Sequence, residues 1–154
     1  MKIVSGNVLE SDSEVIAHSV NCKGVWGKGL ALQAKEKYPS VYERYRIICK
    51  SESQYSNLLG TSFVYKPTEA PESPFIACMF TQIDYSEDTR QTNYEAFYKS
   101  LESVRTFMCR NSLTSISFPC KIGCGLGGGE WTIIEPMIDY VFKDFNVSVF
   151  QLKK

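Results

Sequence analysis

The chain has 154 residues, of which 44% are hydrophobic and 22% charged, the composition of a soluble globular domain large enough to bury a core. Its 17 lysines and arginines balance 17 acidic residues. A formal net charge of zero excludes the broad positive field of a non-specific nucleic-acid or membrane-surface binder. We therefore expect one domain over residues 1–154, a monomer with neither a membrane nor a nucleic-acid partner.

The sequence shows no apolar run long enough to span a bilayer and no apolar segment typical of a signal peptide. These observations favour an intracellular protein, in the cytoplasm or the nucleus. The cysteines are scattered, form no CxxC pair, and are accompanied by a single histidine. Free thiols are therefore expected, and no metal site. The cysteines are Cys22, Cys49, Cys78, Cys109, Cys120 and Cys124.

Strand-like and helix-like patterns alternate along the chain. Strands are expected at residues 2–5, 14–20, 61–66, 75–81, 115–119 and 147–152, the fourth of them central because it is the most apolar. Helices are expected at residues 30–38, 40–50, 93–110 and from 131 onward, with Pro136 near the start of the last one. This alternation predicts an α/β fold with a mixed, largely parallel sheet.

The most distinctive stretch runs from Lys121 to Trp131 and contains five of the ten glycines, all between Gly123 and Gly129. It connects a predicted strand to a predicted helix. This arrangement aims backbone N–H groups and the positive end of a helix at an anion, and glycine lets the backbone approach a ligand closely. The stretch predicts a phosphate or diphosphate site. The alternative is a mobile glycine-rich turn in an ordinary α/β domain.

A second glycine loop, residues 24–29, also follows a predicted strand and precedes a helix. Ligands of α/β sheets bind at the carboxyl ends of strands, so the two loops are expected to form one anion site suited to a diphosphate. His18, the only histidine, and Asn21 end the strand that leads into this loop. An imidazole there could move a proton near neutral pH, although a histidine satisfied inside the core is the alternative.

Several hydrolase signatures are absent from the sequence. No cysteine of the glycine loop is followed by arginine after five residues, no P-loop lysine follows a glycine loop, and no Gly-x-Ser-x-Gly elbow occurs. The glycine-rich stretch also misses the spacing of a Rossmann dinucleotide fingerprint by one residue. What remains is a tightly bound, diphosphate-containing ligand with a positioned acid or base.

Three blocks of sequence together resemble the macro domain family: Gly6-Asn-Val8, His18 to Gln33, and Pro119 to Trp131. The resemblance covers nearly the whole chain and is closest to the branch of the ADP-ribose 1''-phosphate phosphatases. Related branches are the terminal ADP-ribose glutamate glycohydrolases and the DNA ADP-ribosyl glycohydrolase antitoxins. The resemblance implies a three-layer α/β/α sandwich that binds ADP-ribose or ADP-ribose 1''-phosphate without a cofactor.

The resemblance also implies roles for individual residues. His18 and Asn21 would act at the distal ribose, where Asn21 donates a hydrogen bond and His18 serves in catalysis. The two loops would hold the ribose and the diphosphate through Val25, Trp26, Gly27, Gly29, Gly123, Cys124, Gly125, Leu126 and Gly127. The adenine would lie near Asn7, Val8 and, in the last strand, Phe150.

Departures from the family pattern distinguish the branches. Gln82 stands where both glycohydrolase branches have a catalytic lysine, and Gly127 where the glutamate glycohydrolases have an aspartate. Asn7 replaces the acid that many macro domains offer to adenine. We therefore expect hydrolysis of ADP-ribose 1''-phosphate, in which His18 protonates the leaving oxygen or orders water. Glu130 is either a base or a plain charge at a helix start. A non-catalytic ADP-ribose reader, or an ADP-ribosyl or O-acyl-ADP-ribose hydrolase, is the alternative.

Overall fold

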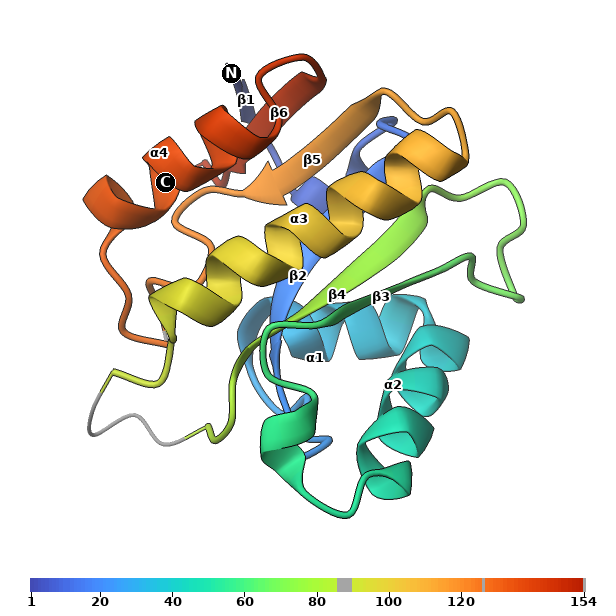
Figure 1. The fold of residues 1–154 in the computed structure, drawn as a ribbon. Helices are drawn as coiled ribbons and strands as arrows, with labels where there is room; N and C mark the ends of the chain where they lie inside the picture. The colour runs from blue at the N-terminus through green and yellow to red at the C-terminus, as the bar shows by residue number, and fades with distance from the viewer. Residues whose placement is uncertain (86–89, 126, 154) are drawn as a thin grey trace.

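The computed structural model describes residues 1–85, 90–125 and 127–153, which contain one six-stranded sheet (Figure 1). Its strand order is β1-β6-β5-β2-β4-β3. Every neighbouring pair is parallel except β3 with β4, so the expected mixed, largely parallel sheet is confirmed. The strands are β1 (Lys2–Ser5), β2 (Val15–Asn21), β3 (Ser62–Tyr65), β4 (Phe75–Gln82), β5 (Ser115–Pro119) and β6 (Asn146–Gln151).

Helices cover both faces of this sheet, which confirms the three-layer α/β/α sandwich. In Figure 1, α3 and α4 lie on one face and α1 and α2 on the other. The helices are α1 (Gly29–Lys37), α2 (Pro39–Ser51), α3 (Tyr94–Arg110) and α4 (Trp131–Val141), with short 3₁₀ helices at Val8–Glu10 and Tyr55–Asn57. None of these described helices combines the length and apolar character that crossing a membrane requires.

The two faces of the sheet bury separate apolar cores. Beneath α3 and α4, the predicted stripe of the longest helix is completely buried: Phe97, Leu101, Val104 and Met108. Beneath α1 and α2, large aromatic side chains dominate: Trp26, Tyr45 and Phe80. Successive residues of a strand point to opposite faces, so β2 contributes Ala17 to the first core and Ile16 to the second. Burying a side chain of the size of Ile16 contributes about 2 kcal/mol.

Local signals explain where α3 and α2 begin. Asn93 starts α3 because its side chain accepts a hydrogen bond from the backbone N–H of Ala96. Pro39 occupies the first turn of α2, where its missing N–H has no intrahelical partner to lose. The expectation for Pro136 was wrong, because this proline lies inside α4 rather than near its start. It therefore removes one hydrogen bond from the helix.

The middle of the sheet is formed by β5 and β2, whereas β4, the strand expected to be central, lies between β2 and the edge strand β3. The register of β2 with β5 covers only the pairs Val15–Ile116 and Ile16–Ser117. The chain leaves β2 toward β3 and β4 but leaves β5 toward β6, on the other side. This is a topological switch point, the place where open α/β sheets bind ligands.

Candidate functional site

A cavity of about 570 Å³ lies at the carboxyl ends of β2 and β5, a volume suited to a small-molecule ligand. One wall is formed by the end of β2, the loop after it and the start of α1. The loop after β5 forms the opposite wall, and Gln82 and Tyr85 follow β4. The expected meeting of the two glycine loops is thus confirmed. Nine predicted site residues line the cavity: His18, Asn21, Val25, Trp26, Gly27, Gly29, Gly123, Gly125 and Gly127.

The other predicted site residues have different positions. Cys124 packs against the core beneath α3 and α4, and its thiol lies 3.6 Å from the carbonyl oxygen of Ile122. Glu130 is exposed at the N-cap of α4 and is not among the residues that line the cavity. Leu126 lies outside the described residues. The base candidate and the cysteine are therefore both outside the cavity wall.

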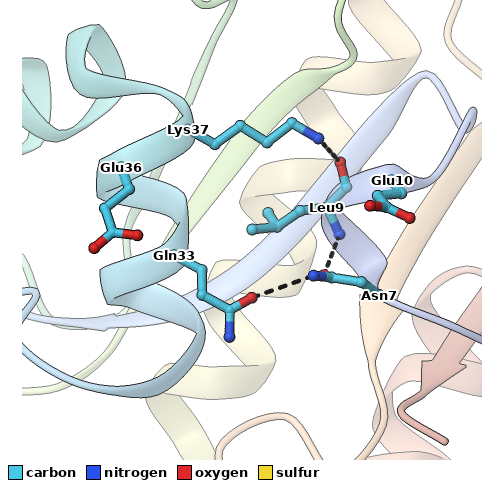
Figure 2. Close-up of a pocket in the computed structure, with 6 residues that line it drawn as sticks. All are labelled: Asn7, Leu9, Glu10, Gln33, Glu36 and Lys37. Atoms are coloured by element: carbon cyan, nitrogen blue, oxygen red, sulfur yellow. Dashed lines mark hydrogen bonds between the residues drawn. The ribbon is translucent and has the colours of Figure 1, made fainter.

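The residues expected near adenine are not among those that line this cavity, and they lie beside the ends of β1 and β6. Val8 is buried, and Phe150 pairs with Val4 across the two strands. Asn7 lines a smaller cavity of about 330 Å³, where its Nδ2 donates to Oε1 of Gln33 at 3.2 Å (Figure 2). The Oδ1 atom of Asn7 accepts from the backbone N–H of Leu9 at 3.0 Å, so this oxygen caps a 3₁₀ helix.

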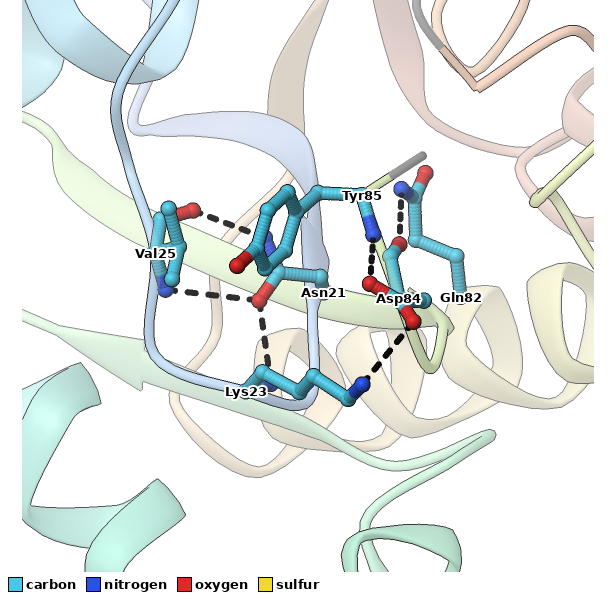
Figure 3. Close-up of polar contacts among 6 residues, drawn as sticks. All are labelled: Asn21, Lys23, Val25, Gln82, Asp84 and Tyr85. Carbon is cyan, nitrogen blue, oxygen red and sulfur yellow. Dashed lines mark hydrogen bonds and ion pairs between the residues drawn. The ribbon is translucent and has the colours of Figure 1, made fainter. Parts of the chain in front are cut away.

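Asn21 shapes the loop that follows β2 (Figure 3). Its Oδ1 accepts from the backbone N–H groups of Lys23, at 2.9 Å, and Val25, at 3.3 Å. Its Nδ2 donates to the carbonyl oxygen of Val25 at 2.7 Å, which leaves one amide hydrogen for another acceptor. The Tyr45 hydroxyl lies 2.6 Å from the backbone oxygen and 2.9 Å from Oδ1 of Asn21. The loop is thus held in place by side chains.

A second set of contacts joins this loop to the segment after β4. Lys23 Nζ lies 2.8 Å from Oδ2 of Asp84, and the other carboxylate oxygen accepts from the backbone N–H of Tyr85 (Figure 3). The hydrogen bond from Lys23 lowers the pKa of Asp84. Gln82 Nε2 donates to the carbonyl oxygen of Asp84 at 2.7 Å. These contacts fix the end of β4 where Gln82 and Tyr85 border the cavity.

His18 lies in the floor of the cavity and is only 4% exposed. Its ring meets the Trp26 ring edge-on at 4.8 Å, and its Nε2 lies 3.3 Å from the Cys78 thiol. Burial lowers the pKa of His18 from 6.5 to about 4, because the charged ring would lose its hydration. The imidazole is therefore neutral at neutral pH. His18 is thus a buried residue that also borders the cavity, and its role in catalysis stays a prediction.

The glycine loop after β5 is held by backbone groups. The carbonyl oxygen of Gly123 accepts from the N–H of Gly129 at 2.8 Å and from the Thr92 hydroxyl at 2.7 Å. The carbonyl oxygen of Gly127 accepts from the N–H groups of Gln91 and Thr92, both at 2.9 Å. Residues just before α3 therefore clamp the loop.

The two departures that separate this chain from the glycohydrolases are neighbours in space. A Cβ atom placed on Gly127 would lie 2.9 Å from Oε1 of Gln82 and 2.4 Å from Oγ1 of Thr92. No side chain fits there unless both residues move. Glycine at 127 and glutamine at 82 are thus parts of one packing arrangement, in which a side chain at 127 would have to displace Gln82.

The charged side chains in the described part of the cavity wall are all cationic. Lys28 and Lys121 line it, and its described lining residues include neither aspartate nor glutamate. Backbone N–H groups of two glycine loops and two ammonium groups suit an anionic ligand. Within residues 1–85, 90–125 and 127–153, no group of three or more His, Cys, Asp and Glu side chains could hold a metal ion.

Sequence reasoning missed the residues that support the loops from a distance. Tyr45 reaches Asn21 from 24 positions away, and Thr92 reaches Gly123 from 31 positions away. Neither position carries a motif. The charges of Lys23 and Asp84 were visible, but only the fold brings them together.

Comparison with known proteins identifies the family. The model of the Macro domain family matches residues 17–138. The chain belongs to the macro domain family. This match includes the first loop, the clamp before α3 and the glycine loop after β5.

Relatives of this macro domain carry two kinds of name. An ADP-ribose 1''-phosphate phosphatase of Lodderomyces elongisporus is 32% identical over 145 residues, which cover 89% of this chain and 87% of that protein. A DNA ADP-ribosyl glycohydrolase of Mycobacterium tuberculosis is 28% identical, but the match covers 90% of this chain and only 38% of the relative. The structure of the macrodomain of Mycobacterium tuberculosis DarG superposes with a TM-score of 0.82, at 25% identity over 96% of both chains.

Proposed function

We propose that this macro domain binds ADP-ribose in the 570 Å³ cavity and hydrolyses ADP-ribose 1''-phosphate to ADP-ribose and inorganic phosphate. The observation that carries the proposal is the convergence of two glycine loops, from β2 and β5, on a cavity with cationic residues and no described acid. The name of the 32% identical relative supports the reaction, because the match extends over most of both chains.

In this proposal, different parts of the cavity have different roles. The loops would hold the diphosphate through backbone N–H groups, which need no reorganisation during the reaction. Asn21 would orient the distal ribose with its remaining amide hydrogen. His18 has a pKa of about 4, so at neutral pH it would order the attacking water rather than protonate the leaving oxygen. Positioning and electrostatic stabilisation can carry such a hydrolysis without a covalent nucleophile.

The packing around Gly127 argues against the lysine-dependent route of the glycohydrolase branches. Gln82 occupies the lysine position, and the space for an aspartate at 127 is filled by Thr92 and by Gln82 itself. Removal of ADP-ribose from DNA or protein therefore ranks below the phosphatase reaction. It would need a different group to activate the bond.

A second candidate function is a reader that binds ADP-ribose without turnover. The specific observation in its favour is the lack of a carboxylate base among the described lining residues, since Glu130 lies outside the cavity wall. The same loops would serve both functions. Only an assay separates them.

The test measures phosphate released from ADP-ribose 1''-phosphate, and ADP-ribose binding by calorimetry, for the wild type and for His18→Gln. We expect release by the wild type and a rate at least about 100-fold lower in the variant, with affinity changed less than about threefold. Equal rates would remove His18 from the mechanism. Binding without release would establish the reader, and no ADP-ribose binding would overturn both functions.

A further inference from the structure

Lys121 holds an unusual backbone conformation at the edge of the cavity. Its φ is +58°, in the left-handed region that side chains with a Cβ avoid. Among the described residues, Ser112 is the only other non-glycine with positive φ, at +55°, and it lies beyond α3. A glycine at position 121 would adopt this conformation without strain. The chain has a lysine there, immediately before a run of glycines.

The conformation of Lys121 is imposed by the turn that follows β5. The backbone N–H of Cys120 donates to the carbonyl oxygen of Phe150 at 2.7 Å, and that of Ile122 to the carbonyl oxygen of Pro119 at 3.1 Å. The carbonyl oxygen of Lys121 itself accepts from Cys124 N–H at 2.9 Å. Because both neighbours are fixed, Lys121 has no freedom to relax. The backbone strain at Lys121 is therefore set by the turn that follows β5.

The side chain of Lys121 is exposed and borders the cavity. None of the residues that the structure describes forms a hydrogen bond or salt bridge with its ammonium group. The described cavity wall also offers it no carboxylate. Lys121 thus combines a strained backbone with an ammonium group that has no acidic partner among the described residues. Such a residue beside a ligand cavity is typically retained for function and not for stability.

We propose that Lys121 is a specificity-determining residue of the cavity, whose ammonium group binds an anionic phosphoryl group of the ligand. This inference deepens the proposed function and rests on it for the identity of the ligand. Lys121 would make affinity depend on the phosphate charge that a ligand carries. An attraction between two solvated charges also weakens as salt rises, which gives the proposal a direct signature.

The test compares the wild type with Lys121→Gly and Lys121→Asn, two residues that tolerate positive φ without the charge. Calorimetry measures ADP-ribose affinity at about 50 mM and 300 mM salt, a range over which screening changes strongly. Each variant should bind about three- to tenfold more weakly at low salt and depend less on salt. Lys121→Gly should also melt at a higher temperature than the wild type, which separates lost binding from damaged folding.

The matched control is Ser112→Gly, which relieves the same kind of strain away from the cavity and should raise the melting temperature without changing affinity. Direct calorimetric titration with inorganic pyrophosphate supplies a probe that does not depend on ADP-ribose recognition. Equal affinities and equal salt dependence in the wild type and Lys121→Asn would overturn the inference. If the wild type binds pyrophosphate but no ADP-ribose, the proposed function fails, and the pyrophosphate affinities of the variants still decide on Lys121.

Discussion

The two loops that face each other across the cavity are built by opposite means. The loop after β2 is shaped by side chains: Asn21 bonds to its backbone, Trp26 anchors it in an aromatic stack, and Lys23 ties it to Asp84. The loop after β5 is shaped by the lack of side chains, because Gly123 and Gly127 bond through backbone carbonyl groups that a Cβ atom would crowd.

This difference sets how each wall responds to mutation. The first loop should fail when a side chain is removed, since its hydrogen bonds and packing disappear with that side chain. The second loop should fail when a side chain is added, since there is no space for one. A single cavity thus depends on two kinds of local order.

The largest effect is expected from Trp26→Ala. The indole is 2% exposed and stacks on Tyr45 with ring centroids 4.7 Å apart. Truncating a buried tryptophan lowers the free energy of unfolding by about 3–5 kcal/mol. Urea unfolding measures the loss. Trp131→Ala at the half-buried start of α4 is the control and should lose clearly less. Equal losses in both variants would mean that Trp26 does not anchor the first loop.

The second-largest effect is expected from Gly127→Ala, in the loop after β5. The added methyl group would lie 2.4 Å from Thr92 Oγ1 and 2.8 Å from the carbonyl oxygen of Gly123. Overpacking of this kind costs about 3 kcal/mol, and the displaced loop should bind ADP-ribose at least about tenfold more weakly. Gly125→Ala is the control for the free energy of unfolding, because nothing lies within 4 Å of its added atom. If both alanine variants bind as the wild type does, the second wall does not depend on empty space.

The smallest of the three effects is a pH dependence of the free energy of unfolding, which arises from His18 in the first wall. The folded pKa of His18, about 4, is below the ordinary value of 6.5, so the unfolded chain binds the proton first as pH falls. Stability is complete above pH 6.5 and is lost as pH falls toward 4. The loss is about 2 kcal/mol between pH 7 and pH 5.

Thermal or urea unfolding at several pH values measures this dependence, and His18→Gln supplies the control. Since the chain has one histidine, the variant should be nearly flat between pH 7 and pH 5. Carboxylates with lowered pKa values, such as Glu14 and Asp84, respond only below that range. An unchanged slope in the variant would show that another group titrates there.

The parts of this molecule that follow from local pattern could be predicted from the sequence. The stripe of α3, the order of strands and helices, and the meeting of two glycine loops depend on periodicity, on glycine and on the rule for the carboxyl ends of strands. The position of β4 was less predictable, because an apolar run shows that a strand is buried but not which strands flank it.

The support of the site could not be predicted in the same way. The side chain of Asn21 was expected to face a ligand, yet most of its hydrogen bonds go to the loop that begins two residues later. The clamp by Thr92 and the contact from Tyr45 join residues that are distant in sequence. Position next to a strand also could not reveal that His18 is desolvated beneath Trp26.

The pairing of β1 with β6 joins the first strand of the chain to the last. The wall that follows β5 is flanked by β6, and β6 is completed only by residues 146–151. During synthesis from the N-terminus, the first wall can therefore emerge well before its counterpart exists. The sheet is completed late, when the final strand is inserted between β1 and β5. Every described residue that lines the cavity precedes β6, so a chain interrupted before β6 would contain all of them and still lack the strand that flanks the second wall.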